Sequence, residues 1–121
     1  QNLLDDHIDK ILDLPYINKE EIAAKNFSVA VDAVNGAGSE AIPRLLERLG
    51  VNSVHKIHCS PNGLFPHNPE PLPEHLTEIC DLVKEKKVDL GVVTDPESIF
   101  LSSFRGCCQG ARSNLLSLCR W

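Results

Sequence analysis

Three short strand-like segments alternate with helical patterns, and this alternation constrains the fold more than any other feature. The segments are residues 27–34, 53–60 and 88–95, and the second is the weakest because His55, Lys56 and His58 interrupt its apolar residues. The first of them, FSVAVDAV, has the composition of a strand buried on both faces. Apolar residues recur at helical spacing in 39–50 and 73–87, between the strands. A strand–helix–strand–helix–strand order predicts two right-handed β-α-β units and a parallel α/β sheet.

The remaining segments complete a single domain. Two helices are predicted before the first strand, at 2–14 and at 18–26, where Asn18 is suited to cap the second helix. The proline-rich stretch 61–73 excludes a helix or a central strand and predicts an ordered surface loop. A chain of 121 residues can bury one core of this kind.

Composition excludes several classes of function. The net charge is −5, and no cluster of lysine and arginine suggests a nucleic-acid partner. No segment is apolar for long enough to span a membrane. The first residues, QNLLDDHIDK, are too acidic for a signal peptide, so we expect a cytoplasmic location. The odd number of cysteines then predicts reduced thiols, with Cys59 and Cys80 in the core.

The character of the chain changes after Pro96. Residues 1–96 carry a net charge of −7, whereas residues 97–121 carry +2 and hold three of the five cysteines. No convincing strand pattern occurs in this tail, and we expect it to be the least ordered part. The third strand would then keep an unpaired edge that invites self-association. The abrupt change leads to the hypothesis of a shifted reading frame or a foreign join.

The turn after the first strand holds one candidate site. Residues 36–41, GAGSEA, match the G-x-G-x-x-G/A pattern that binds dinucleotides between a strand and a helix. Asp32 at the end of the strand would repel a phosphate, and the acid expected about twenty residues further on is missing. A simple strand-to-helix turn containing Gly36 and Gly38 is the other interpretation.

A histidine and two acids are further candidates. His67, in FPHNPEP, has no nucleophile or acid beside it in sequence, which favours a loop histidine over a catalytic one. Asp95 and Glu97 follow the third strand, at the edge of the sheet where α/β proteins bind ligands. Their carboxylates could both reach one Mg²⁺ ion, but a capped turn explains them as well.

Three separated motifs together resemble one family. FSVAVDAVNGAGSEAIPRLLERLGV, FPHNPEPLPEHL and KVDLGVVTDPE are similar to the second domain of the α-D-phosphohexomutases, the phosphoglucomutase/phosphomannomutase family. The resemblance covers about residues 5–97. It implies a three-layer α/β/α domain with a small, mostly parallel sheet of order 2-1-3-4. The fourth strand, antiparallel in the family, is expected to be missing or altered here.

The resemblance also implies a reaction. The family moves a phosphoryl group between the 1- and 6-positions of a hexose phosphate, using a phosphoserine of its first domain. Its second domain supplies a Mg²⁺ loop, D-x-D-x-D-R. On this chain Asp95 matches the first aspartate and Glu97 stands at the second, whereas Ile99 and Phe100 occupy the third aspartate and the arginine. The phosphoserine motif and the sugar-selecting and phosphate-clamping domains are not found in the sequence.

These matches lead to a specific expectation. Residues 1–26 would form leading helices, 27–97 the mutase-like core and 98–121 a divergent tail. We expect a mutase fragment that is catalytically silent alone, has no catalytic residues of its own, and meets hexose phosphate only within a complete enzyme. Two alternatives stay open. One is a nucleotide-binding module, and the other is a non-catalytic fragment that docks on a full-length mutase.

Overall fold

The structure is a computed structural model, and it describes residues 2–70, 72–97, 101–104 and 116–118, the last two segments by their backbone. In these residues the chain forms one five-stranded sheet in the order β2-β1-β3-β4-β5. The strands are β1 (Ser28–Asp32), β2 (Ser53–Ile57), β3 (Leu90–Thr94), β4 (Leu101–Phe104) and β5 (Leu116–Leu118). Strands β1, β2 and β3 are parallel, as the alternation of strands and helices predicts.

The fourth strand corrects one expectation. Strand β4 pairs antiparallel with β3, from Gly91 opposite Phe104 to Thr94 opposite Leu101, and β5 pairs with β4. The family order 2-1-3-4 is therefore present, so that of the two expected outcomes, a missing or an altered fourth strand, the first is wrong. Backbone groups make the pairing, so an apolar pattern in the tail is not required. The open edge expected on β3 is occupied, although self-association itself stays a prediction.

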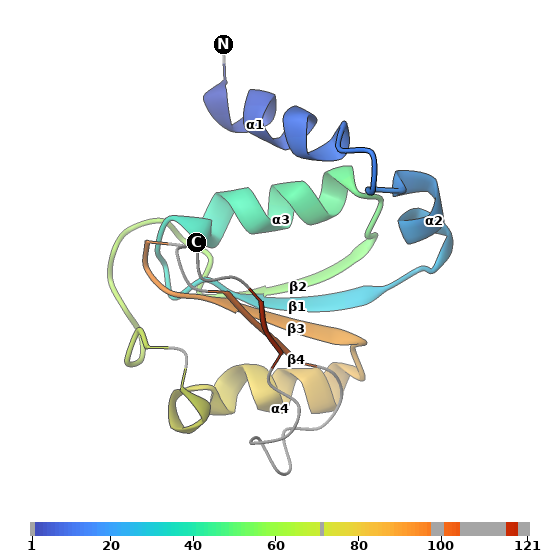
Figure 1. Ribbon diagram of the computed structural model, residues 1–121. Coiled ribbons are helices and arrows are strands. Elements are labelled where there is room, and N and C mark those ends of the chain that lie inside the picture. Colours follow the sequence, from blue (N-terminus) through green and yellow to red (C-terminus); the bar gives the residue numbers. More distant parts are fainter. Residues whose placement is uncertain (1, 71, 98–100, 105–115, 119–121) are drawn as a thin grey trace.

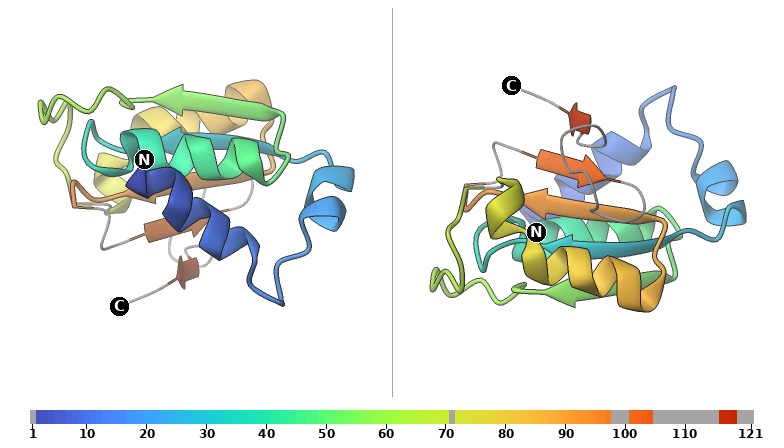
Figure 2. Two further views of the ribbon diagram at one scale, coloured as in Figure 1. Left: turned by 90° about the horizontal axis from the view of Figure 1, so that it is seen from above. Right: turned by 90° about the horizontal axis from the view of Figure 1, so that it is seen from below.

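Helices cover both faces of the sheet and give the three layers that the resemblance implies. Helix α3 lies against one face and α4 against the other, and α1 lies on the outer side of α3 (Figures 1 and 2). The helices are α1 (Leu3–Leu12), α2 (Lys19–Ala24), α3 (Gly38–Arg48) and α4 (Thr77–Lys86), with a 3₁₀ turn at Pro73–His75. Asn18 caps α2 as predicted, because its side chain accepts a hydrogen bond from the Glu21 amide at 3.0 Å.

The core has two halves, one on each face of the sheet. Val29 and Val31 of β1 pack toward α3, and Ala30 packs toward α4. Alternate residues of a strand point to opposite faces, so burial on both sides explains the continuous apolar run. Helix α4 adds Ile79 and Val83, both almost fully buried. Burying each such side chain contributes about 1.5 to 3 kcal/mol.

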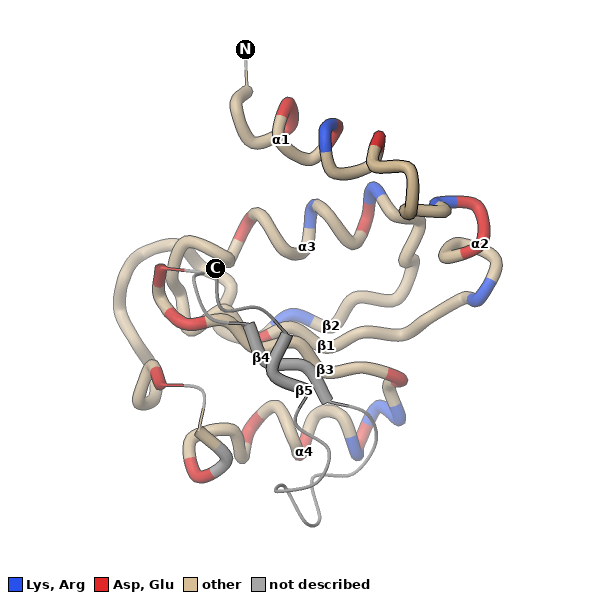
Figure 3. Tube along the Cα trace, viewed as in Figure 1, with Lys and Arg blue, Asp and Glu red and all other residues tan. Residues whose placement is uncertain are grey.

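Ion pairs join α1 to the outer face of α3, where acidic and basic positions mark both helices (Figure 3). Arg44 contacts Asp5 at 3.1 Å and Glu40 at 2.6 Å, and Arg48 contacts Asp9. All of these side chains are partly exposed, so each pair contributes about 1 kcal/mol or less. They orient α1 more than they stabilise the domain.

No helix in the described part of the chain has the length and apolar character needed to cross a membrane.

Candidate functional site at the carboxyl edge of the sheet

The three parallel strands end at one edge of the sheet. Asp32, the last residue of β1, lies opposite Ile57 of β2 and Val93 of β3. The segments that follow these strands therefore meet there. They are the turn 33–37, the proline-rich loop with the residues before it, and the loop 95–97. This edge is where α/β proteins place ligands.

Asp32 is the centre of this edge. Its side chain is only 1% exposed. One carboxylate oxygen, Oδ1, accepts a hydrogen bond from the Val34 amide at 2.9 Å, and Oδ2 lies 2.7 Å from Nε2 of His67. A buried carboxylate is costly unless its oxygens are paired. Asp32 satisfies this condition by binding its own turn and a loop 35 residues away.

His67 is held in its charged form by this arrangement. Its Nδ1 lies 2.7 Å from the carbonyl oxygen of Asn68, and its Nε2 faces Asp32. A neutral imidazole has one N–H, so donation to both acceptors requires the imidazolium. Burial alone would lower the pKa of His67, but the hydrogen bonds to Asn68 and Asp32 outweigh it and raise that pKa above its ordinary value.

His58 joins the same cluster from the end of β2. Its ring centroid lies 5.4 Å from that of His67, with the rings nearly perpendicular, and its Nε2 lies 2.8 Å from a carboxylate oxygen of Glu78 on α4. The backbone of His58 has a φ of 49°, a left-handed conformation that is uncommon outside glycine. Asp32, His58 and His67 each place a potential metal-ligand atom within 4.8 Å of the others.

The turn after β1 is also left-handed, and it ties the loops together. Val34 and Asn35 have φ values of 48° and 57°. For a β-branched residue such as Val34 this conformation is a genuine outlier. The Asn35 side chain donates to the Leu64 carbonyl at 2.9 Å and accepts from the Ser60 amide at 3.0 Å. The hydrogen bonds of Asn35 with Ser60 and Leu64 thus hold the strained turn against the loop.

Gly36 allows the turn to touch the loop of the candidate acids. A Cβ atom at this position would lie 2.5 Å from the carbonyl oxygen of Pro96, which is closer than any real contact. The next amide, that of Ala37, donates to the same oxygen at 2.7 Å. Close packing against Pro96 therefore explains the glycine without a bound nucleotide.

The predicted metal ligands lie beside this contact. Asp95 directly follows β3 and is half-buried, and Glu97 is exposed two residues later. A shallow cavity of about 290 Å³ adjoins them, between the β1 turn and the proline-rich loop, and Pro96 and Phe65 line its two sides. The positions of Ile99 and Phe100 lie outside the described residues.

The comparisons with known proteins agree with this geometry. Residues 5–98 match the family described as "Phosphoglucomutase/phosphomannomutase, alpha/beta/alpha domain II". A phosphoglucomutase/phosphomannomutase of Thermococcus kodakarensis is 39% identical over 83 residues, which are 68% of this chain and 18% of that protein. A phosphoglucosamine/phosphogalactosamine mutase of Sulfurisphaera tokodaii is 34% identical over 107 residues, 85% of this chain and 23% of that protein. The chain belongs to this family.

The fold of this mutase-family domain is also found in solved structures. A putative phosphomannomutase of Thermus thermophilus superposes with a TM-score of 0.72, at 19% identity, over 87% of this chain and 24% of that one. The chain spans about a fifth of the curated relatives that it matches. The similarity therefore identifies the domain, and the activity of a complete mutase is a separate question.

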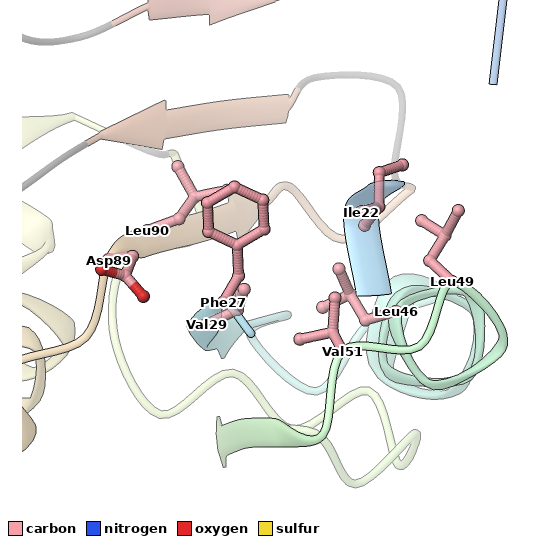
Figure 4. Close-up of a pocket in the computed structure, with 8 residues that line it drawn as sticks. All are labelled: Ile22, Phe27, Val29, Leu46, Leu49, Val51, Asp89 and Leu90. Carbon is pink, nitrogen blue, oxygen red and sulfur yellow. The ribbon is translucent and has the colours of Figure 1, made fainter. Parts of the chain in front are cut away.

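A larger pocket of the mutase-family domain lies away from this edge. It measures about 440 Å³ and is drawn in Figure 4. Phe27 and Leu90 line it near the amino ends of their strands, and Ile22 of α2 and Leu46 of α3 close it from the helix side. Among the described residues that line it, Asp89 is the one that carries a charge, and the others are apolar. This lining differs from the polar edge of the sheet around Asp32 and Asp95.

The two cysteines that the structure describes in the mutase-family domain differ from one another. Cys59 is a free thiol, as predicted, and burial followed by the nearby Asp32 charge raises its pKa above the ordinary value. Cys80 packs beside the α4 half of the core as predicted, but it is disulfide-bonded, so the expectation of a reduced thiol is wrong there. The odd cysteine count could not show this, because a count says nothing about which thiols come close together.

The sequence suggested Asp95 and Glu97, whose metal role stays a prediction, and it did not indicate the pair at the centre of this edge. It treated Asp32 only as an obstacle to phosphate binding and His67 as a histidine without a partner. The structure joins these two residues at 2.7 Å. The position of Asp32 at the end of a strand could have indicated this contact. The loop that follows the neighbouring parallel strand starts at the same edge of the sheet, so its residues can reach Asp32.

Proposed function

We propose that this domain supplies the metal loop of a hexose-phosphate mutase, with Asp95 and Glu97 as its remaining carboxylates, and that it is catalytically silent alone. The observation that supports this most strongly is the place of Asp95. It follows β3, whose neighbours are β1 and the antiparallel β4, in the order that the family resemblance implies. Its loop is fixed to the β1 turn through the bond from Ala37 to Pro96.

The residues present do not make a complete Mg²⁺ site. Magnesium prefers oxygen ligands in octahedral geometry and usually binds through carboxylates together with a substrate phosphate. Asp95 and Glu97 offer such oxygens, but Ile99 and Phe100 stand where the family pattern has an aspartate and an arginine. We therefore assign no catalytic step to the ion, and we propose that this chain binds Mg²⁺ weakly.

The proposal of catalytic silence concerns residues 1–121 taken alone. Phosphoryl transfer needs a donor, a positioned sugar and charge stabilisation around one phosphate. Removing one charge-stabilising group commonly lowers the rate by about 10² to 10³. The sequence contains no phosphoserine motif of the family type, so several such losses combine. The hexose phosphate substrate is thus proposed only for a complete enzyme.

The test is an assay of the purified chain with glucose 1-phosphate or mannose 1-phosphate, a sugar bisphosphate activator and Mg²⁺. We expect no turnover, either in the wild type or in the double variant Ile99→Asp/Phe100→Arg, because neither carries the family's phosphoserine motif. The matched control is Asp95→Ala. Turnover that follows the chain through purification and disappears in Asp95→Ala would refute catalytic silence.

The two alternatives can be tested beside it. In the nucleotide-binding alternative, Gly36 and Gly38 would hold a pyrophosphate, and NAD or ATP would raise the melting temperature. The contact of Gly36 with Pro96 supports the packing role instead. A fragment that docks on a full-length mutase would co-purify with that mutase. Docking, self-association and a cytoplasmic location remain predictions.

A further inference from the structure

The cluster of Asp32, His58 and His67 takes no part in the proposed mutase role. We infer that these three residues form a binding site for a divalent transition metal ion of the zinc class. They come from the ends of β1 and β2 and from the proline-rich loop, and their ligand atoms lie within 4.8 Å of one another. Ligands bound to Zn²⁺ at about 2.0 to 2.1 Å lie about 3.3 Å apart in a tetrahedron, so small movements suffice.

The donor set selects the type of ion. Two imidazoles and one carboxylate suit Zn²⁺ and Co²⁺, whereas Mg²⁺ prefers oxygen ligands alone. Three protein ligands leave the fourth tetrahedral position for water. The site is thus chemically different from the loop of Asp95 and Glu97, which offers only oxygens.

Each ligand already has a second partner that orients it. A metal-binding histidine usually donates its other ring N–H to a carbonyl or a carboxylate. Nδ1 of His67 bonds the Asn68 carbonyl at 2.7 Å, which leaves Nε2 directed at Asp32. Nε2 of His58 lies 2.8 Å from a carboxylate oxygen of Glu78, so an ion bound at Nδ1 would leave this orienting contact in place. The Val34 amide holds Asp32, so one carboxylate oxygen remains for the ion.

Burial and charge are consistent with the exchange of a proton for a metal ion. The side chains of Asp32, His67 and His58 are 1%, 13% and 20% exposed, so an ion can enter from the histidine side. It would take the place of the proton between Nε2 of His67 and Asp32, and that proton would leave to solvent. The bound ion would then join the turn after β1 to the two segments that follow β2.

The experiment is a calorimetric titration of the full chain with Zn²⁺, after its accessible thiols have been alkylated so that they cannot bind the ion. Co²⁺ is the spectroscopic probe, since a nitrogen and oxygen site gives visible bands without the sulfur charge-transfer band of a thiolate site. The variants are His58→Gln and Glu78→Gln, and circular dichroism confirms that each is folded. The matched control is His7→Gln, an exposed histidine on α1.

We expect one Zn²⁺ per chain. His58→Gln should weaken the affinity by about 100-fold or more, and Glu78→Gln should weaken it by about 10-fold, the effect typical of an orienting partner. His7→Gln should bind as the wild type does. Absence of stoichiometric binding, equal affinity in His58→Gln and the wild type, or a sulfur band in the Co²⁺ spectrum would each overturn the inference. If His58→Gln does not fold, the Glu78→Gln variant decides, because its side chain is 57% exposed and its loss should leave the fold intact.

Discussion

Asp32 lies at the same edge of the sheet as the pair Asp95 and Glu97, but these acids are held in place differently. Asp32 is buried, and its two oxygens bind the Val34 amide and the His67 ring. Asp95 and Glu97 lie nearer the surface, on a loop fixed through the backbone of Pro96. Asp32 has a partner from a distant part of the chain, His67. Asp95 and Glu97 form a short continuous motif.

This difference predicts unequal effects on stability. A buried charge destabilises the fold unless it is paired, so Asp32 needs a charged partner, either the His67 ring or a bound ion. Asp95 is only half-buried and Glu97 is exposed, so neither charge depends on a partner to the same degree. We therefore expect changes at Asp32 to lower stability and changes at Asp95 to leave it nearly unchanged.

The largest effect is expected from Asp32→Ala. This change leaves the part-buried ring of His67 and the Val34 amide without their partner, and breaking a fully buried pair costs about 3 to 5 kcal/mol, which is the upper limit here. Urea unfolding followed by circular dichroism measures the loss. The exposed Asp13→Ala variant should change the free energy of unfolding by less than about 0.5 kcal/mol.

A double-mutant cycle checks that the effect arises from the pair. Asp32→Asn combined with His67→Gln should cost less than the sum of the two single changes, by about 1 to 3 kcal/mol. Additive costs would show that Asp32 stabilises the turn alone, and the proposed contrast with Asp95 would lose its basis.

Gly36→Ala should have the next largest effect. The added Cβ atom would lie 2.5 Å from the Pro96 carbonyl oxygen, and a rigid backbone group cannot move away easily. Overpacking of this kind costs about 1 to 3 kcal/mol. Gly63→Ala is the control: it has a left-handed φ of 70° but nothing within 4 Å, so it isolates the backbone cost. Gly36 has no positive φ and so does not share this backbone cost, and a loss of less than about 0.5 kcal/mol in Gly36→Ala would contradict a steric contact with Pro96.

The pH dependence of stability should be dominated near neutrality by His67. Its pKa in the folded protein is raised above the ordinary value of 6.5, so its contribution is complete below that value and is lost as the pH rises through the folded pKa. Asp32, His58 and Glu78 are the titratable groups around it.

This dependence is measured as the free energy of unfolding in metal-free buffer, from about pH 5.5 to about 8.5. Stability should decline through the upper half of this range, and the decline should be smaller in His67→Gln. The thiol of Cys59 interferes only at higher pH, since its pKa is raised from 9.0. A wild type and a His67→Gln variant with identical pH profiles would show that the imidazolium is not stabilising.

The sequence predicted the layers of the fold because buried strands and helix starts both leave patterns in residues that are neighbours in sequence. Apolar runs such as 27–34 mark buried strands. Asn18 marks a helix start because its side chain caps the residues that directly follow it. Strand β4 was missed because pairing with β3 needs backbone groups, which every residue has, and Leu101–Phe104 shows no alternation.

Sequence patterns could suggest site residues only where these lie close together along the chain. Asp95 and Glu97 were suggested by their spacing together with the family resemblance, and their metal role stays a prediction. The pair of Asp32 and His67 joins positions 35 residues apart, and the contact depends on how the proline-rich loop turns back over the sheet. Gly36 illustrates the same limit, since its neighbour Pro96 is brought close only by the parallel pairing of β1 and β3.

The smallest effect is expected from Mg²⁺ and concerns Asp95. An ion that binds only the folded state stabilises it by about 0.4 kcal/mol when its concentration equals the dissociation constant. With two carboxylates and no phosphate, we expect less than this at about 10 mM Mg²⁺, in the wild type and in Asp95→Asn alike. Ile99→Asp adds the third carboxylate of the family pattern and should produce a measurable rise in melting temperature. That rise should disappear when Asp95→Asn is added. A tight, stoichiometric site in the wild type that Asp95→Ala abolishes would show instead that two acids suffice, and the loop would then be a working metal site.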